Sequence, residues 1–104
     1  MAYAAKRNPN RCPTHPGALL REDLIPATNK SVAEIAKLLG LSRQHLYDIV
    51  SERKPISPNV AVRLGKLFGD GAGIWTRMQA AYDTWHAERD VDVSDIPTIK
   101  TKAA

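Results

Sequence analysis

Apolar residues in this chain recur every three or four positions, which is the period of amphipathic helices. The clearest stretch is residues 31–50, with two successive apolar faces made of Val32, Ile35, Ala36 and Leu39 and then of Leu46, Ile49 and Val50. Gly40 stands between the faces, where a left-handed residue ends a helix, and Ser31 with Glu34 has the spacing of a capping box. The pattern predicts a helix-turn-helix whose second helix, about residues 42–51, is free to enter the major groove of DNA.

One further helix is predicted before this pair. It begins near Pro16 and carries Leu20 and Leu24 on one face. We expect it to stop at Pro26, because proline suits the first turn of a helix but removes a hydrogen bond from its interior. Residues 27–30 then form a loop.

Two more helices are predicted in the second half of the chain. Ser57 and Pro58 are a cap followed by a first-turn proline, and they open a helix whose inward residues are Val60, Ala61, Leu64, Leu67 and Phe68. The glycine-rich residues 69–73 predict a flexible joint. Residues 74–88 then predict a last helix, with an aromatic stripe made of Trp75, Met78, Tyr82 and Trp85.

The predicted fold class is therefore all-α, a five-helix bundle that contains a helix-turn-helix. We divide the chain into a flexible basic arm over residues 1–14, a domain over residues 15–89 and a tail over residues 90–104. The tail mixes Val91 and Val93 with aspartates and a proline, and it is either a short extended segment that docks on a partner subunit or a frayed end.

Charge is unevenly spread along the 104 residues. Residues 1–69 hold 11 Lys and Arg against 5 Asp and Glu, a net charge of +6, whereas residues 70–104 hold 4 against 6, a net charge of −2. The basic part contains the helix-turn-helix, as a phosphate-binding protein requires. The start of the chain has no hydrophobic signal segment and Cys12 is the single cysteine, so we expect a cytoplasmic protein that does not enter a membrane.

The outward face of the second helix is polar, as a base-reading helix requires. Arg43 and Gln44 lie near its start, where side chains reach furthest into the groove. We expect Arg43 to pair with guanine and Gln44 with adenine, each pair giving about 1–3 kcal/mol of discrimination. Tyr47 offers its ring to a thymine methyl group and its hydroxyl to phosphate. Asp48 either accepts a hydrogen bond from a cytosine amine or orients Arg43 or His45.

Four other residues are candidates for phosphate contacts. Ser31 and Ser42 stand at the starts of the two helices, and Arg53 and Lys54 follow the second helix directly. Phosphate contacts set the position of a protein on DNA without reading sequence. The alternative interpretation is a helical bundle in which the polar face of the helix over residues 42–51 is merely solvated and binds no DNA.

Nothing in the sequence points to a metal, a cofactor or catalysis. His15, His45, His86 and Cys12 are widely separated, and no pair has the spacing of zinc ligands. The glycines of residues 69–73 follow a helix and lack the lysine of a phosphate loop. No serine, histidine and aspartate pattern indicates a triad. We expect no metal, no cofactor and no enzymatic activity.

The aromatic stripe of residues 74–88 has two interpretations, core packing and contact with a second copy. We expect Trp75 in the core, because such stripes most often seal a helix onto its own domain. Trp85 and Ala81 are expected to contact a second copy, with Val91 and Val93 of the tail as further candidates. A dimer suits the reading of a palindrome, whose half-sites lie about 34–36 Å apart.

With these residues in place, the chain resembles the HigA family of antitoxins, within the phage-repressor-like (XRE) helix-turn-helix group. The likeness covers about residues 15–89. Its motifs are His15-Pro16-Gly17, Ala33-Glu34-x-Ala36-x-x-Leu39-Gly40, Ile56-Ser57, Arg63-Leu64, Phe68-Gly69 and Trp75-x-x-x-Gln79-x-x-Tyr82-Asp83. The helix-turn-helix alone is typical of a large superfamily, whereas the opening His-Pro-Gly with the Trp, Gln and Tyr-Asp helix is more specific.

The resemblance implies a homodimer that binds an operator palindrome in double-stranded DNA and represses its own operon. It also implies a partner protein from that operon, a toxin resembling the RelE- and HigB-type mRNA endonucleases. By this likeness Ser42, Arg43, Gln44 and Tyr47 fall on recognition-helix positions, and the two basic residues after them on the phosphate-binding loop. The sequence leaves open a stand-alone repressor of phage type, with no toxin partner.

The chain departs from the family pattern at several positions. Glu52 stands where glycine is frequent, which predicts that the second helix of the pair runs on slightly. Ala18 follows His-Pro-Gly, where an acidic residue is frequent. A third hypothesis, a pure interaction protein that keeps the helix-turn-helix as a scaffold, is disfavoured by the polar side chains on the second helix.

Overall fold

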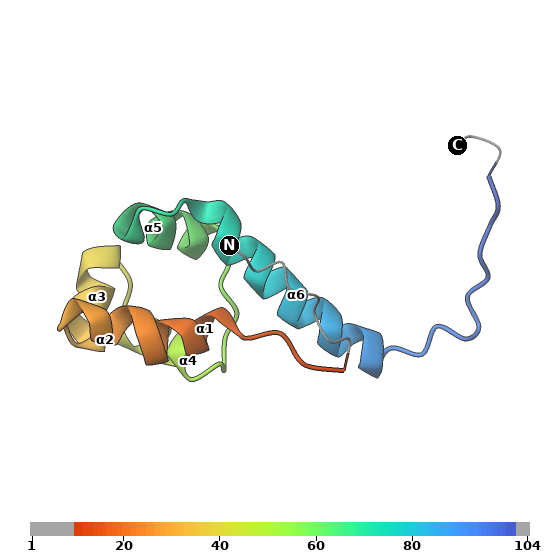
Figure 1. Ribbon diagram of the computed structural model, residues 1–104, viewed down its shortest axis with the longest axis horizontal. Coiled ribbons are helices and arrows are strands. Elements are labelled where there is room, and N and C mark those ends of the chain that lie inside the picture. Colours follow the sequence, from red (N-terminus) through yellow and green to blue (C-terminus); the bar gives the residue numbers. More distant parts are fainter. Residues whose placement is uncertain (1–9, 102–104) are drawn as a thin grey trace.

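The computed structural model describes residues 10–101, and its regular structure over that range is helical throughout (Figure 1). Five helices confirm the predicted all-α class. The first helix consists of three segments that follow one another without a break. They are α1 (Pro16–Leu19), the π-helical η1 (Leu20–Leu24) and α2 (Ile25–Thr28).

Pro26 does not end this helix, so the predicted stop there is wrong. Within η1 the hydrogen bonds widen, and the N–H of Ile25 donates to the carbonyl of Leu20, five residues back. Pro26 then falls in the first turn of α2, where a missing N–H costs little. The helix ends instead at Asn29, whose φ of 61° is left-handed.

The helix-turn-helix forms as predicted, from α3 (Val32–Leu39) and α4 (Arg43–Val50). The capping box is present at the start of α3: the N–H of Glu34 donates to the Ser31 hydroxyl at 3.1 Å, and the N–H of Ser31 donates to the Glu34 carboxylate at 2.8 Å. Gly40 ends α3 with a φ of 73°. Replacing an N-cap serine such as Ser31 by alanine typically costs about 1 kcal/mol.

The last two helices are α5 (Pro58–Phe68) and α6 (Ala72–Asp90). The segment between them is a hydrogen-bonded turn rather than the predicted flexible joint, because the N–H groups of Gly69 and Gly71 both donate to the carbonyl of Gly65. A Cβ atom on Gly65 would overlap the backbone of Gly71. Glycine at position 65 therefore lets the start of α6 lie directly against α5.

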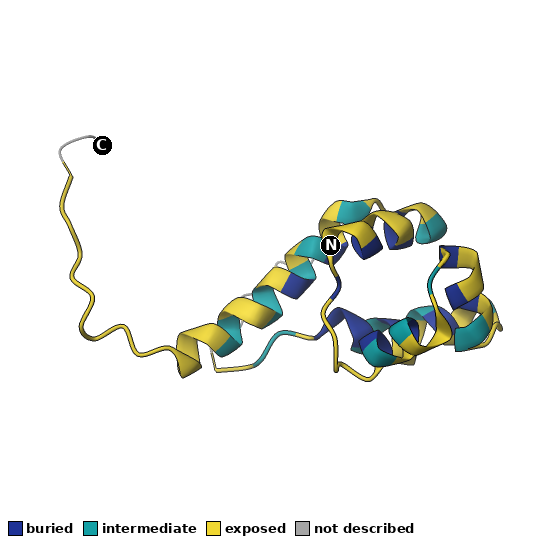
Figure 2. Ribbon diagram, turned by 180° about the vertical axis from the view of Figure 1, so that it is seen from behind, coloured by how far each residue is buried: buried dark blue, intermediate teal, exposed yellow. Residues whose placement is uncertain are grey.

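The core lies between the four shorter helices and the first turns of α6, as the buried residues in Figure 2 show. Trp75 is 1% exposed and belongs to the core, as predicted. The other buried apolar residues are Leu20, Ile25, Ile35, Ala36, Leu39, Leu46, Ile49, Val50, Ile56, Val60, Ala61 and Leu64. Within residues 10–101, no helix combines the length and apolar character that crossing a membrane requires.

Helix α6 projects beyond the body of the domain, and residues 91–101 continue away from it as an extended tail (Figure 1). At the other end of the chain, part of the predicted arm lies against α6. The Sγ atom of Cys12 is 3.5 Å from Nε2 of His86. The rest of the predicted arm, residues 1–9, lies outside the described residues, as do residues 102–104.

Candidate nucleic-acid interface

Helix α4 separates its apolar and polar side chains cleanly between two faces. Leu46 and Ile49 are fully buried, whereas Arg43, Gln44 and Tyr47 are exposed, as the sequence predicted. Because Ser42 accepts a hydrogen bond from the N–H of His45 at 3.0 Å, the start of the helix is fixed where the polar side chains stand. The polar face is thus presented from a rigidly packed support.

Asp48 gathers the polar residues at the far end of this face. Its Oδ1 atom accepts from Nε2 of Gln44 at 2.9 Å and from Nη2 of Arg53 at 3.0 Å, and its Oδ2 atom lies 3.7 Å from Nζ of Lys54. The hydrogen bonds from Arg53 and then Gln44 hold the pKa of the Asp48 carboxyl below its ordinary value. These partners differ from the predicted ones, Arg43 and His45.

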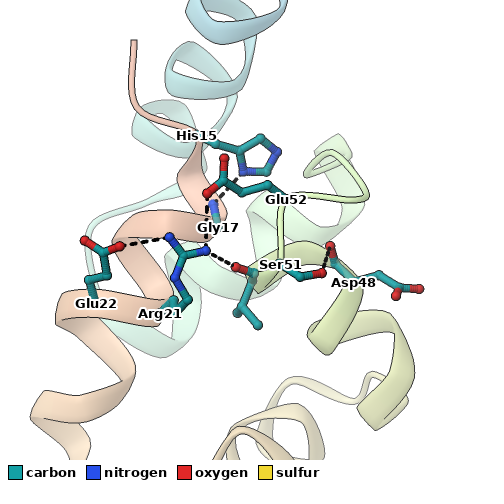
Figure 3. A network of polar contacts seen from close by, with 8 residues as sticks. His15, Gly17, Arg21, Glu22, Asp48, Ser51 and Glu52 are labelled. Atoms are coloured by element: carbon teal, nitrogen blue, oxygen red, sulfur yellow. Dashed lines mark hydrogen bonds and ion pairs between the residues drawn. The ribbon is translucent and has the colours of Figure 1, made fainter. Parts of the chain in front are cut away.

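The carbonyl end of α4 is held by Arg21, a residue that the sequence analysis missed (Figure 3). Its Nη1 atom donates to the carbonyl of Val50 and, at 3.2 Å, to Oε2 of Glu52. Its Nη2 atom pairs with Glu22 at 2.8 Å. No local pattern could have revealed this role, because the guanidinium reaches 29 residues along the chain.

The turn after α4 depends on Glu52, which has a φ of 66°. This left-handed backbone explains why glycine is frequent at the position, since glycine adopts it without steric cost. The expectation that α4 runs on is wrong: the helix ends at Val50, and the N–H groups of Arg53 and Lys54 turn back to the carbonyl of Asp48, at 2.8 and 3.1 Å. The turn thereby places both cations beside the Asp48 carboxylate.

The His-Pro-Gly motif fixes the first helix against α4. The Nδ1 atom of His15 accepts from the N–H of Gly17 at 2.8 Å, which caps α1 (Figure 3). A Cβ atom on Gly17 would overlap the carbonyl oxygen of Ile49, so only glycine permits this approach. Burial lowers the pKa of the His15 imidazole, which favours the neutral form that the cap requires.

The motif on α6 fixes the loop that follows α4. Oε1 of the buried Gln79 accepts from the N–H of Ile56 at 2.8 Å, and its Nε2 donates to Asp83 at 2.9 Å. Tyr82 packs edge-on against the His15 ring, with 4.8 Å between ring centroids. The most specific motifs of the family resemblance therefore position α4 and its loop, and they lie on the buried side of that helix.

The remaining predicted residues lie elsewhere. Ser31 caps α3, as described above. Ala81 and Trp85 are half-buried on α6, where the guanidinium of Arg89 lies 3.6 Å from the Trp85 ring centroid. Val91 and Val93 of the tail are 56% and 59% exposed.

The fold brings two of the dismissed metal-ligand candidates together, Cys12 and His86. Among residues 10–101, however, no group of three potential metal ligands is found.

Comparison with known proteins places this arrangement in a family. Virulence-associated protein I of Dichelobacter nodosus is 40% identical over 76 residues, which are 73% of this chain and 70% of that protein. The Escherichia coli helix-turn-helix transcriptional regulator YbaQ is 28% identical over 78% of this chain and 72% of its own. The structure of the Pseudomonas aeruginosa antitoxin HigA with the higBA promoter superposes with a TM-score of 0.70 at 32% identity, covering 77% of this chain and 96% of that one. No protein-family model matches the sequence.

The capped, polar-faced α4 and these likenesses define a DNA-binding helix-turn-helix protein. Within that class, the chain belongs to the HigA-like family of XRE-type antitoxins.

Proposed function

We propose that this chain is a homodimeric antitoxin that binds an operator palindrome, represses its own operon and neutralises a RelE- or HigB-like mRNA endonuclease by direct contact. The observation that carries the proposal is the outward face of α4, where Arg43, Gln44 and Tyr47 are exposed on a helix fixed at both ends. The Pseudomonas aeruginosa relative that was solved with a promoter supports DNA as the ligand.

We assign recognition of the DNA sequence to the first turns of α4. Arg43 makes no hydrogen bond or ion pair within the described residues, so its guanidinium is available for a guanine edge. Gln44 donates one N–H to Asp48, which leaves its Oε1 atom and its second N–H for an adenine edge. Tyr47, 46% exposed, adds contact with a thymine methyl group or a phosphate.

We assign the positioning of the protein on the DNA backbone to the groups around these residues. Arg53 and Lys54 are assigned to phosphates, with Ser31 and Ser42 at the starts of α3 and α4. Asp48 is tolerated so close to DNA because its charge is matched: with both cations the cluster carries a net charge of +1. We therefore assign to Asp48 the orientation of Gln44 and Arg53 rather than contact with a cytosine.

The test of the antitoxin assignment is to search beside this gene for a short basic reading frame and, where one is found, to co-express the two. If the assignment holds, the neighbour arrests growth alone, this protein restores growth, and the two co-purify. A charge-neutral surface variant such as Val62→Ser, which changes an exposed residue of α5, serves as the matched control and restores growth equally. Operator binding is measured separately with DNA from upstream of the gene.

A stand-alone transcriptional repressor is the second candidate, and the likeness to the regulator YbaQ favours it. It predicts tight operator binding without growth rescue and without co-purification. If the wild-type protein neither rescues growth nor binds the operator, both candidates are contradicted, because each depends on DNA binding by α4.

A further inference from the structure

An apolar groove separates the first helix from α6 on the flank of the domain. It encloses about 670 Å³. Its apolar lining comes from Ala18 and Leu19 of the first helix on one side, from Ile74, Met78 and Ala81 of α6 on the other, and from Pro13 of the preceding segment. The three residues of α6 follow a spacing of four and three, so they form one stripe along the helix. Ile74 is 41% exposed, which shows that the groove is open to solvent.

This stripe is distinct from the one that holds α6 to its own domain. The inner stripe contains Trp75, Gln79 and Tyr82, which contact the core, Ile56 and His15. The groove stripe lies one position earlier on the helix and faces the gap beside α1 and η1. Helix α6 therefore carries two adjacent lines of side chains, and among the described residues the inner line is the more deeply buried, whereas the groove stripe is only partly covered.

The tail beyond α6 has apolar side chains that the rest of the described chain, residues 10–101, leaves largely exposed. Val91, Val93, Ile96 and Ile99 are between 56% and 81% exposed. They recur every two or three residues along a segment that leaves the body of the domain (Figure 1). Four large apolar residues exposed on one short segment are typical of an interaction surface.

We propose that the tail of one copy occupies the groove of a second copy, and that the second copy's tail does the same in return. The proposal rests on the homodimer proposed above and names its interface. In this arrangement the two α6 helices cross near Trp85 about a two-fold axis, and each tail continues across the stripe of Ile74, Met78 and Ala81. The contact is isologous, as a closed dimer requires.

Charge complementarity supports the same occupant. The groove carries Arg77 on the α6 side and Glu22 and Asp23 on the η1 side. The tail has the matching order of charges, with Asp92 and Asp95 first and Lys100 five residues later. If the tail enters the groove beside α6 and leaves it beside η1, its two aspartates lie near Arg77. Lys100 then lies near Glu22 and Asp23.

The path of the chain favours exchange between copies over folding back. Val91 has φ −96° and ψ 123°, an extended conformation that carries the tail onward from α6. The following turn is local, with the N–H of Ile96 donating to the carbonyl of Val93 at 2.9 Å, and the N–H of Ser94 donating to Asp92 at 2.9 Å. Both bonds are local to the tail, and the tail leads away from the body of the domain (Figure 1).

The first experiment measures the dimer dissociation constant of the full chain by analytical ultracentrifugation over a dilution series. We expect at least a tenfold increase for the tail variant Val93→Ser with Ile96→Ser, and for the groove variant Ile74→Glu. Val62→Ser, an exposed valine on α5, is the matched control and leaves the constant unchanged. Circular dichroism melting checks that each variant is folded, which these exposed positions should permit.

The second experiment mixes the two defective chains. The Ile74→Glu chain keeps an intact tail and the tail variant keeps an intact groove, so a mixed dimer regains one tail-groove contact. We expect the mixture to dimerise more tightly than either variant alone. Unchanged dissociation constants in the single variants, or no gain on mixing, would overturn the exchange. A wild-type chain that stays monomeric would overturn it too.

Operator binding separates this inference from the proposed function. The measurement uses wild-type protein and upstream DNA, so it reports on α4 whatever the dimer interface is. If the wild type binds the upstream DNA but the tail and groove variants dimerise as tightly as the wild type, the exchange is refuted and the proposed function stands. Absence of binding in the wild type, with the expected loss of dimerisation in the variants, would refute the function and leave the interface standing.

Discussion

The two sides of helix α4 are built in opposite ways. On the inner side, backbone atoms and buried side chains meet at fixed distances: Gly17 touches the Ile49 carbonyl, and Arg21 holds the carbonyl of Val50. On the outer side, Arg43 and Tyr47 extend into solvent. The difference separates two tasks, because the inner side determines where the helix stands and the outer side determines what it can bind.

This comparison also locates the family resemblance. The motifs that make it specific, His-Pro-Gly and the Gln79 helix, are on the supporting side of α4. They place α4 in the fold, and this placement does not depend on which DNA sequence is bound. The exposed residues Arg43, Gln44 and Tyr47 on the outer side have no packing role in the core, so their substitution need not disturb the fold.

The largest effect is expected from breaking the support at Gly17. The Cβ of a Gly17→Val variant would overlap the Ile49 carbonyl, which belongs to the backbone and can move only with α4. We expect a loss of about 2–4 kcal/mol in the free energy of unfolding, measured by urea denaturation.

Gly73→Ala is the matched control for this prediction. Its Cβ would approach only the flexible end of the Arg77 side chain, and alanine is the better helix former. This variant should be as stable as the wild type or slightly more so. Equal losses at both glycines would show that the contact with Ile49 is not special.

The next effect concerns the outer side alone. Arg43→Ala should weaken operator binding by about 1–3 kcal/mol while leaving binding to unrelated DNA nearly unchanged, because a base contact contributes only on the correct sequence. Fluorescence anisotropy with both DNAs at one salt concentration measures the difference. The melting temperature should not change, since Arg43 is exposed and contacts nothing in the core.

Lys54→Ala sharpens the contrast between reading and positioning. A phosphate contact contributes on any sequence, so we expect a similar loss on operator and unrelated DNA. The slope of log K against log salt should become shallower by about 1. A loss confined to the operator would move Lys54 to the group of base-reading residues.

A smaller effect is expected in the pH dependence of the free energy of unfolding, through His15 on the buried side of α4. Burial lowers the His15 pKa below 6.5 in the folded chain, so the unfolded chain binds a proton first as the pH falls. The stability that depends on neutral His15 is therefore fully present above pH 6.5 and is lost as the pH falls below it. Asn at this position can accept the same cap without titrating, so His15→Asn should flatten the stability profile between pH 7 and 5.

Much of this architecture could be predicted because it depends on local spacing. The capping box of Ser31 and Glu34, the left-handed Gly40 and the burial of Trp75 each follow from a few neighbouring residues. The exposure of Arg43 and Gln44 follows from the same periodicity. Their contacts with DNA remain predictions, as does the assignment of Ser31, Ser42 and Tyr47.

The features that could not be predicted depend on geometry or on distant partners. Pro26 is tolerated because η1 widens the helix by one residue, and no propensity signals such a turn. Arg21 reaches the end of α4 across 29 positions. The partners of Asp48 were misjudged because Glu52 reverses the chain and brings Arg53 back to the helix.

The bare contact between Gly17 and Ile49 has an evolutionary consequence. Backbone atoms are the same in every sequence, so a separation set by backbone against backbone does not change when side chains mutate. Under the proposed function, α4 can therefore exchange its exposed residues, and with them the operator that it binds, without a compensating change in its packing. A new DNA specificity could then arise by single substitutions on the exposed face of α4, while the packing of the helix stays the same.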